Sequence, residues 1–596
     1  MDQKRLLAAI AISIGILLVF DAYNRSNRPP PQPIQQTTEQ AAAPASNATP
    51  AVPVPAGQQA VTAAPGDAPA EAARGPAPRL PVSGPRVEGS LNLRGAQLDQ
   101  LVLRDYRETI EPNSPQVQLF SPRETTEGYF AQWGWTAADG RTRVPDNNSE
   151  WQASAPRLTP DTPVTLTWDN GQGQVFEIGL TLDANYMVNV QQRVRNSGTD
   201  SVSVLPWARI RRQGLPHLAG YYVLHEGFIG VLDGRLQEMT YANVKSEGEK
   251  RRGPGMEQDA RGGSWLGFTD KYWLAALIPA EADTVMRAAF RHVAEGGQDR
   301  WQADMAPNAP QIVAAGATAQ LATRLFAGAK VVSILDDYAS RLGITDFDKA
   351  VDFGWFYFLT KPFFYAIHWL NSIVGNFGIA ILLFTLFIKG LFFPLQSKAY
   401  HSMAKMKLLA PKMQELKERH KDDPQKVQSE MMALYRTQKI NPASGCLPIL
   451  IQIPVFFSLY KVIFVTIEMR QAPFFGWIRD LSSPDPTNVF NLFGLLPFDP
   501  AQYSHYLHMP ALALLMGCTM WAQQRLNPQP PDPIQAKIFA WMPVIFTFML
   551  ASFPAGLVLY WTWNNLLSIA QQSYIMRHDR AKARAEKRAG ALAKKG

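Results

Sequence analysis

The sequence predicts a polytopic α-helical membrane protein with six membrane spans, joined to one large all-β domain. One apolar run lies near the N-terminus, and five further apolar stretches lie in the C-terminal half. Between them, apolar and polar residues alternate in short segments over residues 86–345. About 20 apolar residues can cross a bilayer as a helix, whereas alternation with period two is typical of strands. At 596 residues, the chain is also too long for one ordinary domain.

Residues 1–27 are expected to form a signal-anchor span. Lys4 and Arg5 precede the run LLAAIAISIGILLVF, and Asp21 and Tyr23 follow it where a cleavable signal peptide would carry small residues. We therefore favour an uncleaved anchor over a cleaved signal peptide. The next segment, residues 28–85, is dominated by Pro, Ala and Gln and has too few large apolar residues to fold, so we expect a disordered tether.

Residues 86–345 are expected to form a soluble all-β sandwich that the first span exports to the periplasm. Val164, Leu166 and Trp168 alternate before the turn at residues 169–171, and similar segments with turn residues recur along the region. Three histidines are scattered among these segments, namely His217, His225 and His292. Since no paired carboxylate motif accompanies them, we assign this domain no chemistry.

Residues 346–372 are expected to form an amphipathic segment that lies on the membrane surface. The stretch FGWFYFLTKPFFYAIHWL is rich in Trp and Tyr, which favour the interface between lipid and water. Pro362 follows Lys361 in its middle and is expected to interrupt the helix. The alternative is a further membrane span, which the proline and the short gap to the next apolar stretch argue against.

Residues 373–576 are expected to form a five-span core. Its first span, Asn376 to Leu395, carries Lys389 with Thr385 four residues earlier, on one helix face. The following residues, 396–445, carry two stripes of apolar residues at helical spacing and predict a helical hairpin. This hairpin contains ten Lys or Arg against five Asp or Glu, which places it in the cytoplasm.

Parity settles how many times the rest of the core crosses the membrane. Single spans are expected at Cys446 to Val465 and at Pro510 to Leu526, and the block from Ala536 to Tyr574 is just long enough for two short spans joined at residues 553–556. The tail, residues 577–596, has eight Lys or Arg and two acids and should be cytoplasmic. Six spans place both termini in the cytoplasm, whereas five would leave the tail outside.

No catalytic constellation survives inspection of the sequence. There is no nucleotide-binding GxxxxGK[ST], no zinc-binding HExxH, no GxSxG, and no cysteine pair with metal spacing, so we expect neither cofactor nor metal. A Ser-Lys membrane protease that uses Lys389 with Ser397 is the enzyme alternative, supported by those residue types alone.

Polar residues inside the apolar stretches are more informative. They are Thr385, Lys389, Gln452, Tyr560, Asn564 and Asn565. Taken singly, each is explained by a hydrogen bond between helices, and Lys389 by a side chain that reaches up to the interface. Together with short spans, they favour a water-containing recess that opens to the cytoplasm.

At these residues the chain becomes recognisable. The stretches KAYHSMAKMKLLAPKMQELKERHKDDPQKVQSEMMALYRTQKINPASGCLPILIQIPVF, EMRQAPFFGWIRDLSSPDP and MPVIFTFMLASFPAGLVLYWTWNNLLSIAQQ closely resemble the YidC membrane protein insertases of Gram-negative bacteria. The resemblance extends over the whole chain, including GGSWLGFTDKYWLAALIP in the β domain. It implies a periplasmic domain of the mutarotase-like β-super-sandwich type and a non-enzymatic insertase core.

The resemblance also implies functional residues. In the family, a hydrophilic groove within the membrane holds one basic residue, which is more often arginine. The matching residue here is Lys389. A lysine keeps the positive charge but lacks the planar guanidinium group, which can donate two parallel hydrogen bonds to a carboxylate. The groove positions are expected to be Lys389, Thr385, Gln452 and Tyr560. The positions that line the substrate's path are expected to be Phe456, Met516 and Met549.

The implied function is the insertion and folding of nascent inner-membrane proteins, alone or with the Sec translocon. Residues 396–445 and the tail are expected to meet ribosomes or targeting factors, with anionic lipid head groups as a compatible alternative and no specific nucleic-acid recognition. Two other functions remain as alternatives: a translocon-associated chaperone without autonomous insertion, and a small-solute transporter, which would need internal repeats that the sequence does not show.

Overall fold

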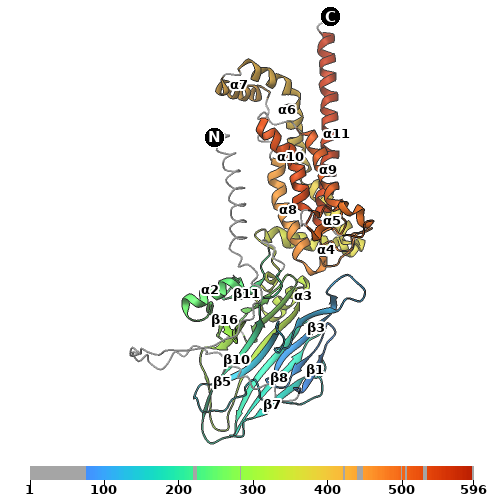
Figure 1. Ribbon diagram of the computed structural model, residues 1–596. Coiled ribbons are helices and arrows are strands. Elements are labelled where there is room, and N and C mark those ends of the chain that lie inside the picture. The colour runs from blue at the N-terminus through green and yellow to red at the C-terminus, as the bar shows by residue number, and fades with distance from the viewer. Residues whose placement is uncertain are drawn as a thin grey trace, which may run out of the picture. The chain divides into compact units, whose positions relative to one another are not determined.

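A computed structural model describes residues 76–218, 224–281, 284–420, 423–438, 447–498, 500–503, 507–527 and 533–593. The expected anchor and most of the expected tether lie outside these residues. The described part combines a β-sandwich with a group of helices (Figure 1).

The β domain consists of two antiparallel sheets. The first sheet has the order β1-β2-β3-β5-β10-β17-β16-β13, with β4 beside β3 and β18 beside β10. Its strands are β1 (Arg79–Ser83), β2 (Val87–Asn92), β3 (Gln97–Arg107), β4 (Gln116–Phe120), β5 (Tyr129–Ala137), β10 (Val202–Gln213), β13 (Met256–Ala260), β16 (Met286–Glu295), β17 (Gln298–Pro307) and β18 (Gln311–Val313). The all-β sandwich expected from alternation is confirmed.

The second sheet has the order β12-β11-β14-β15-β19-β9-β8-β7-β6. Its strands are β6 (Gln152–Ala153), β7 (Val164–Asp169), β8 (Gln174–Leu182), β9 (Met187–Asn196), β11 (Gly227–Leu232), β12 (Arg235–Met239), β14 (Trp265–Thr269), β15 (Trp273–Pro279) and β19 (Thr318–Ala329). The turn predicted after Trp168 joins β7 to β8, where the Asp169 side chain accepts a hydrogen bond from the Gly171 amide and Gly171 adopts φ +72°.

The sandwich begins earlier than expected. β1 lies inside the segment 28–85 that composition predicted to be a disordered tether, so its last residues belong to the folded domain. Leu80 and Val82 point into the core, whereas Pro81 lies between them on a strand at the edge of the sheet. An edge strand tolerates proline because one side of it needs no backbone donor.

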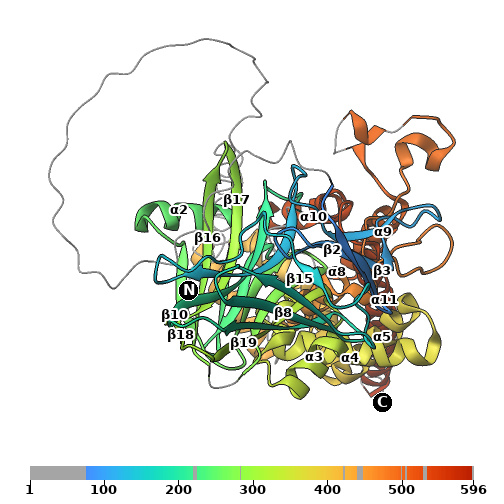
Figure 2. The same cartoon turned by 90° about the horizontal axis from the view of Figure 1, so that it is seen from below.

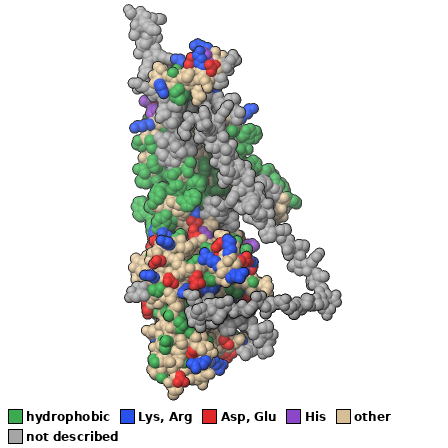
Figure 3. All heavy atoms as spheres, turned by 90° about the vertical axis from the view of Figure 1, so that its left-hand side faces the viewer, with side chains coloured by type: hydrophobic (Ala, Val, Ile, Leu, Met, Phe, Trp, Pro, Cys, Tyr) green, Lys and Arg blue, Asp and Glu red, His purple; other side chains and the backbone are tan. Residues whose placement is uncertain are grey.

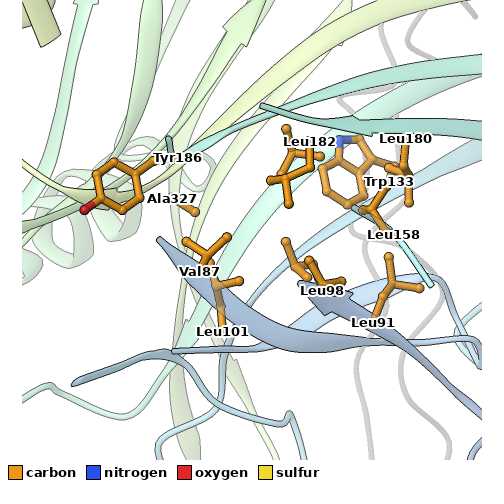
Figure 4. A pocket seen from close by; sticks show the side chains of 12 residues that line it. Val87, Leu91, Leu98, Leu101, Trp133, Leu158, Leu180, Leu182, Tyr186 and Ala327 are labelled. Carbon is orange, nitrogen blue, oxygen red and sulfur yellow. The ribbon is translucent and has the colours of Figure 1, made fainter. Parts of the chain in front are cut away.

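A small cavity lies between the two sheets (Figure 4). Val87, Leu98 and Leu101 point into it from the first sheet, and Leu180 and Leu182 from the second. Aliphatic and aromatic side chains line the space, so it offers a ligand little to bind with except apolar contact. We interpret it as an imperfection in the packing of the core.

Among the described residues, two α-helices accompany the sheets, α2 (Tyr241–Arg251) and α3 (Val332–Leu342), and eight follow them. The eight are α4 (Tyr357–Val374), α5 (Phe377–Leu391), α6 (Phe393–Arg419), α7 (Pro424–Thr437), α8 (Leu447–Val465), α9 (Ala511–Leu526), α10 (Pro533–Leu550) and α11 (Ala555–Ala593). The long helix α11 contacts α5, α6, α8 and α9. Figure 3 shows hydrophobic side chains gathered over the helices, whereas the surface of the sandwich carries mixed charges.

Two expectations about prolines need correction. The helix α4 continues through Pro362 and is not interrupted there, because the proline removes one backbone hydrogen bond and the other bonds of this 18-residue helix remain. The expected 20-residue span from Asn376 to Leu395 is instead broken at Phe392, where α5 meets α6 at an angle of 69°. Pro394 in the first turn of α6 explains the break, since its ring cannot continue the hydrogen-bond ladder of α5.

Within the described residues, none of the helices alone has both the length and the apolar composition needed to cross a bilayer, but α5 and α6 meet that test as a bent pair. The expected hairpin at 396–445 is present as α6 and α7, and Asp423 caps α7 by accepting hydrogen bonds from the amides of Gln425 and Lys426. The expected pair of helices near the C-terminus is present as α10 and α11, separated at residues 551–554.

The β domain and the residues just after it contact α8 and the segment that follows α8. Asp352 forms an ion pair of 2.8 Å with Lys461 of α8. Beyond α8, the Arg470 guanidinium donates to the Arg107 carbonyl at 2.5 Å, and the Glu468 carboxylate accepts from the Val332 amide at 3.2 Å. These contacts connect the first turn of α3 and the end of β3 to the helical region.

The buried carboxyl of Glu468 makes the stability of the folded protein depend on pH. Its Oε2 is buried and has no hydrogen-bond partner among the described residues, and burial raises the pKa of the carboxyl from 4.5 to about 7. Because burial raises the pKa, the contribution of this carboxyl to folding stability is fully present below pH 4.5 and is lost as the pH rises through about 7, by up to about 3 kcal/mol.

We therefore expect Glu468→Gln to remove part of the pH dependence of thermal unfolding. Between pH 5 and 8, the Tm of the wild type should fall more steeply than that of Glu468→Gln, and the variant should be the more stable of the two at pH 8. The comparison is made on the full chain in detergent, and other titrating groups cancel between the two proteins. Parallel curves would show that Glu468 does not titrate in this range.

Candidate functional site

Lys389 lies near the end of α5 with only 9% of its surface exposed. Its ammonium group donates a hydrogen bond of 2.7 Å to the hydroxyl of Ser568 on α11. The Ser568 hydroxyl in turn donates to the carbonyl of Asn564 at 2.7 Å. Among the described side chains, no carboxylate forms an ion pair with Lys389. The structure thus holds a buried positive charge with a neutral partner.

Thr385 lies one turn before Lys389 and is also buried. Its hydroxyl donates to the Ile381 carbonyl of its own helix at 2.7 Å. This bond satisfies the donor inside an apolar helix, while the hydroxyl oxygen keeps acceptor capacity. Thr385 therefore adds polarity to the face of α5 that carries Lys389. Among the described residues, the hydrogen bond of its hydroxyl goes to Ile381 and not to another predicted site residue.

Gln452 and Tyr560 form a second polar contact between helices. The Gln452 amide of α8 donates to the hydroxyl of Tyr560 on α11. Tyr560 is 2% exposed, so this hydroxyl is removed from solvent and needs the partner that it finds.

One face of α11 joins these two contacts. Tyr560, Asn564 and Ser568 are spaced four residues apart, so their side chains lie one above another along the helix, and all three are buried. Tyr560 meets Gln452 of α8, and Ser568 meets Lys389 of α5. The structure therefore brings three of the four predicted groove residues to a continuous polar stripe, defined here by Tyr560, Asn564 and Ser568.

Sequence reasoning missed Ser568. A serine in a helix carries no signal by itself, because its hydroxyl can bond to its own backbone. The spacing of eight residues from Tyr560 and four from Asn564 could have singled it out.

The three residues predicted to line the substrate's path lie in different environments. Phe456 of α8 packs edge-on against Trp561, with ring centroids 4.7 Å apart. Met516 of α9 is completely buried, whereas Met549 of α10 is 48% exposed. They do not share one surface here, and their role in a path remains a prediction.

Contacts also connect the stripe's helix to the hairpin. His401 of α6 lies 2.6 Å from the carboxylate of Asp579 on α11. Gln571 of α11 donates to the Ser397 hydroxyl at 3.3 Å. These two contacts hold the first part of α6 against α11, and the Ser397 hydroxyl accepts its hydrogen bond from an amide.

Comparison with known proteins identifies the family. A family model described as the YidC periplasmic domain matches residues 79–366, and one described as the 60Kd inner membrane protein matches residues 369–583. The membrane protein insertase YidC of Granulibacter bethesdensis is 53% identical over 97% of this chain and 98% of its own. The chain belongs to the YidC membrane protein insertase family.

Two solved structures are similar over parts of the chain. One is an active YidC insertase with its first transmembrane domain resolved, 17% identical, covering 83% of this chain and 91% of that one, with a TM-score of 0.34. The other is a galactose mutarotase-like protein from Lactobacillus casei, 9% identical, covering 42% of this chain and all of that one, with a TM-score of 0.29.

Membership of the YidC family places the chain in the inner membrane with a periplasmic domain, which is the β-sandwich. The matched 60Kd inner membrane protein region contains every residue that the sequence predicted for the site. The polar stripe on α11 and its partners on α5 and α8 therefore lie in the region that this inner-membrane family model covers. Figure 1 shows α5, α8 and α11 close together.

Proposed function

We propose that this insertase binds the polar tail of a nascent membrane protein at the stripe on α11 while the apolar segment moves into lipid. The observation that carries the proposal is the buried ammonium of Lys389, whose described partner is the neutral Ser568. A buried cation is costly unless an anion accompanies it. An acidic tail that passes through the site would supply that anion for a short time, and leave again.

The driving force in this proposal comes from the substrate. Transfer of its apolar segment to lipid yields about 25 cal/mol per Å². Movement of an acidic residue outward gains about 2 kcal/mol for every 100 mV of inside-negative potential. No nucleotide, metal or covalent step is needed, so we propose an insertase and chaperone that is not an enzyme.

Short helices would lower the remaining barrier. The 18 residues of α10 and the 16 of α9 reach about 27 Å and 24 Å, against about 30 Å of hydrocarbon. Helices shorter than the apolar layer draw the bilayer thinner around them. A polar tail would then cross a thinner layer beside the stripe.

The partners and the topology are part of the proposal. We propose six spans with both termini in the cytoplasm, and that α6, α7 and the basic tail meet ribosomes or targeting factors. Ten Lys or Arg in residues 396–445 support such contacts, and they suit anionic lipid head groups as well. Some substrates would pass through this protein alone, and others together with the Sec translocon.

The test is insertion by the purified protein in liposomes that lack a translocon. A small single-span protein with an acidic N-terminal tail is added, and protection of its tail from external protease is measured. We expect clear protection above empty liposomes. Protection no greater than that of empty liposomes would rule out autonomous insertion and leave a chaperone that works beside the translocon.

A further inference from the structure

The connection between α8 and α9 carries a cluster of exposed apolar side chains at residues 489–498, here named the apolar tip. The exposed fractions are 47% for Phe490, 52% for Leu492, 58% for Phe493, 82% for Leu495 and 46% for Phe498. The ten residues, VFNLFGLLPF, include no charged side chain. Figure 2 shows this connection, in orange, standing away from the helices. A soluble surface rarely exposes so many large apolar residues in one short segment.

The side chains of two asparagines form hydrogen bonds with the backbone of the tip and of the residues near it. The side chain of Asn488, which is 3% exposed, accepts from the Phe490 amide at 3.2 Å and donates to the Leu507 carbonyl at 2.9 Å. The side chain of Asn491 accepts from the Gly494 amide at 2.9 Å and donates to the Phe498 carbonyl at 3.4 Å. Because these polar groups are already paired, moving the tip into an apolar environment carries a reduced desolvation cost.

The backbone holds two large apolar residues in an unfavourable conformation. Leu492 and Phe493 adopt φ values of +52° and +59°, a region that costs a residue with a Cβ about 1 kcal/mol or more. Both side chains nevertheless point outward and are more than half exposed. In water, the exposed apolar side chains contribute no burial energy that could offset the strain of the turn. In an apolar phase, their burial would offset it.

The base of the tip lies at one end of the membrane-embedded helices. Asp485 accepts from the Leu512 amide in the first turn of α9 at 3.0 Å, and the Ser483 carbonyl accepts from the Ala555 amide at the start of α11 at 2.7 Å. The tip is therefore fixed to the ends of two helices in the region that the 60Kd inner membrane protein model covers, where we expect the bilayer surface. On the same connection, Phe475 and Trp477 are 60% and 51% exposed.

We propose that the apolar tip is a lipid anchor, which inserts Leu492, Phe493 and Leu495 into the bilayer beside α9. Phe and Leu side chains partition into the layer between head groups and acyl chains. Since the tip has no Lys or Arg, its binding depends on apolar burial and is independent of anionic head groups. The anchor requires nothing of the insertion mechanism proposed above.

Spin labelling of the full chain in liposomes tests the anchor. A nitroxide is placed at Leu495→Cys after Cys446→Ser and Cys518→Ser, and its collision rates with oxygen and with a water-soluble nickel complex are measured. Ile312 of β18, 77% exposed in the periplasmic domain, provides the matched control as Ile312→Cys. We expect an oxygen-to-nickel ratio several-fold higher at residue 495 than at residue 312, with equal values in neutral and anionic liposomes.

Two results would overturn the anchor. Equal ratios at the two positions, with free access for nickel, would place the tip in water. Low access for both reagents at residue 495 would mean that protein covers it, in which case the tip is a docking surface for a polypeptide. A second label at Phe493→Cys must give the same answer as residue 495, so a local disturbance by one label cannot decide the outcome.

Discussion

Replacing Lys389 by alanine should reduce translocon-independent insertion of a substrate with an acidic tail by at least about tenfold. An acidic residue in the centre of a bilayer costs about 3 kcal/mol, which corresponds to about 150-fold in rate if the Lys389 charge offsets all of it. The readout is protease protection of the tail in liposomes, followed over time to give an initial rate. A substrate with an uncharged tail should be affected much less.

Two further variants separate charge from packing at the same place. Lys389→Arg keeps the charge and should retain most of the rate, whereas Lys389→Met fills a similar volume without charge and should behave like Lys389→Ala. Ser568→Ala removes the hydrogen-bond partner of Lys389 while leaving the charge, and should cost only a few-fold. If Lys389→Met inserts the acidic substrate as fast as the wild type, the lysine is a side chain that reaches toward the interface and takes no part in transport.

Asp304→Ala should destabilise the periplasmic domain by about 3–5 kcal/mol, because it removes the shared partner of two arginines, of which Arg209 is buried and Arg291 is half-buried. Asp304 is 8% exposed, and its carboxylate lies 2.7 Å from Arg209 and 3.1 Å from Arg291 on the neighbouring strands. The arginine charges would then remain in a poorly solvated place between β10 and β16. Urea denaturation of a fragment of residues 76–350 should show a lower midpoint with an unchanged slope.

A matched acidic residue provides the control. Asp200 lies exposed in the turn between β9 and β10, and Asp200→Ala should change the free energy of unfolding by no more than about 0.5 kcal/mol. A change below 1 kcal/mol for Asp304→Ala would mean that water reaches Arg209 and Arg291 in the folded domain and that the three charges are not a buried network.

Local patterns were sufficient for most of the fold. The strands of the sandwich followed from alternation because one face of each strand must be buried, as Val164 and Leu166 are in β7. The hairpin of α6 and α7 followed from two stripes of apolar residues at helical spacing, and the structure adds Asp423 as the cap of the second helix. Both features are encoded within a few residues of where they act.

The errors arose where the outcome depends on distant parts of the chain. Pro81 looked like part of a tether, but its strand lies at a sheet edge, which only the strand order reveals. The break at Phe392 was hidden because the apolar run continues across it, although Pro394 was visible in the sequence. The pairing of Lys389 with Ser568 depends on how α5 packs against α11, across 179 positions of sequence.

The length of α11 has a mechanical consequence. The helix runs from Ala555 to Ala593 as one element, with Ser568 in its first half and Asp579 in its second. Asp579 holds His401 of the hairpin, and about 17 Å of unbroken helix separates it from Ser568. A displacement of His401 in the hairpin would therefore shift Ser568, the partner of Lys389, because the helix between Asp579 and Ser568 has no break that could bend instead.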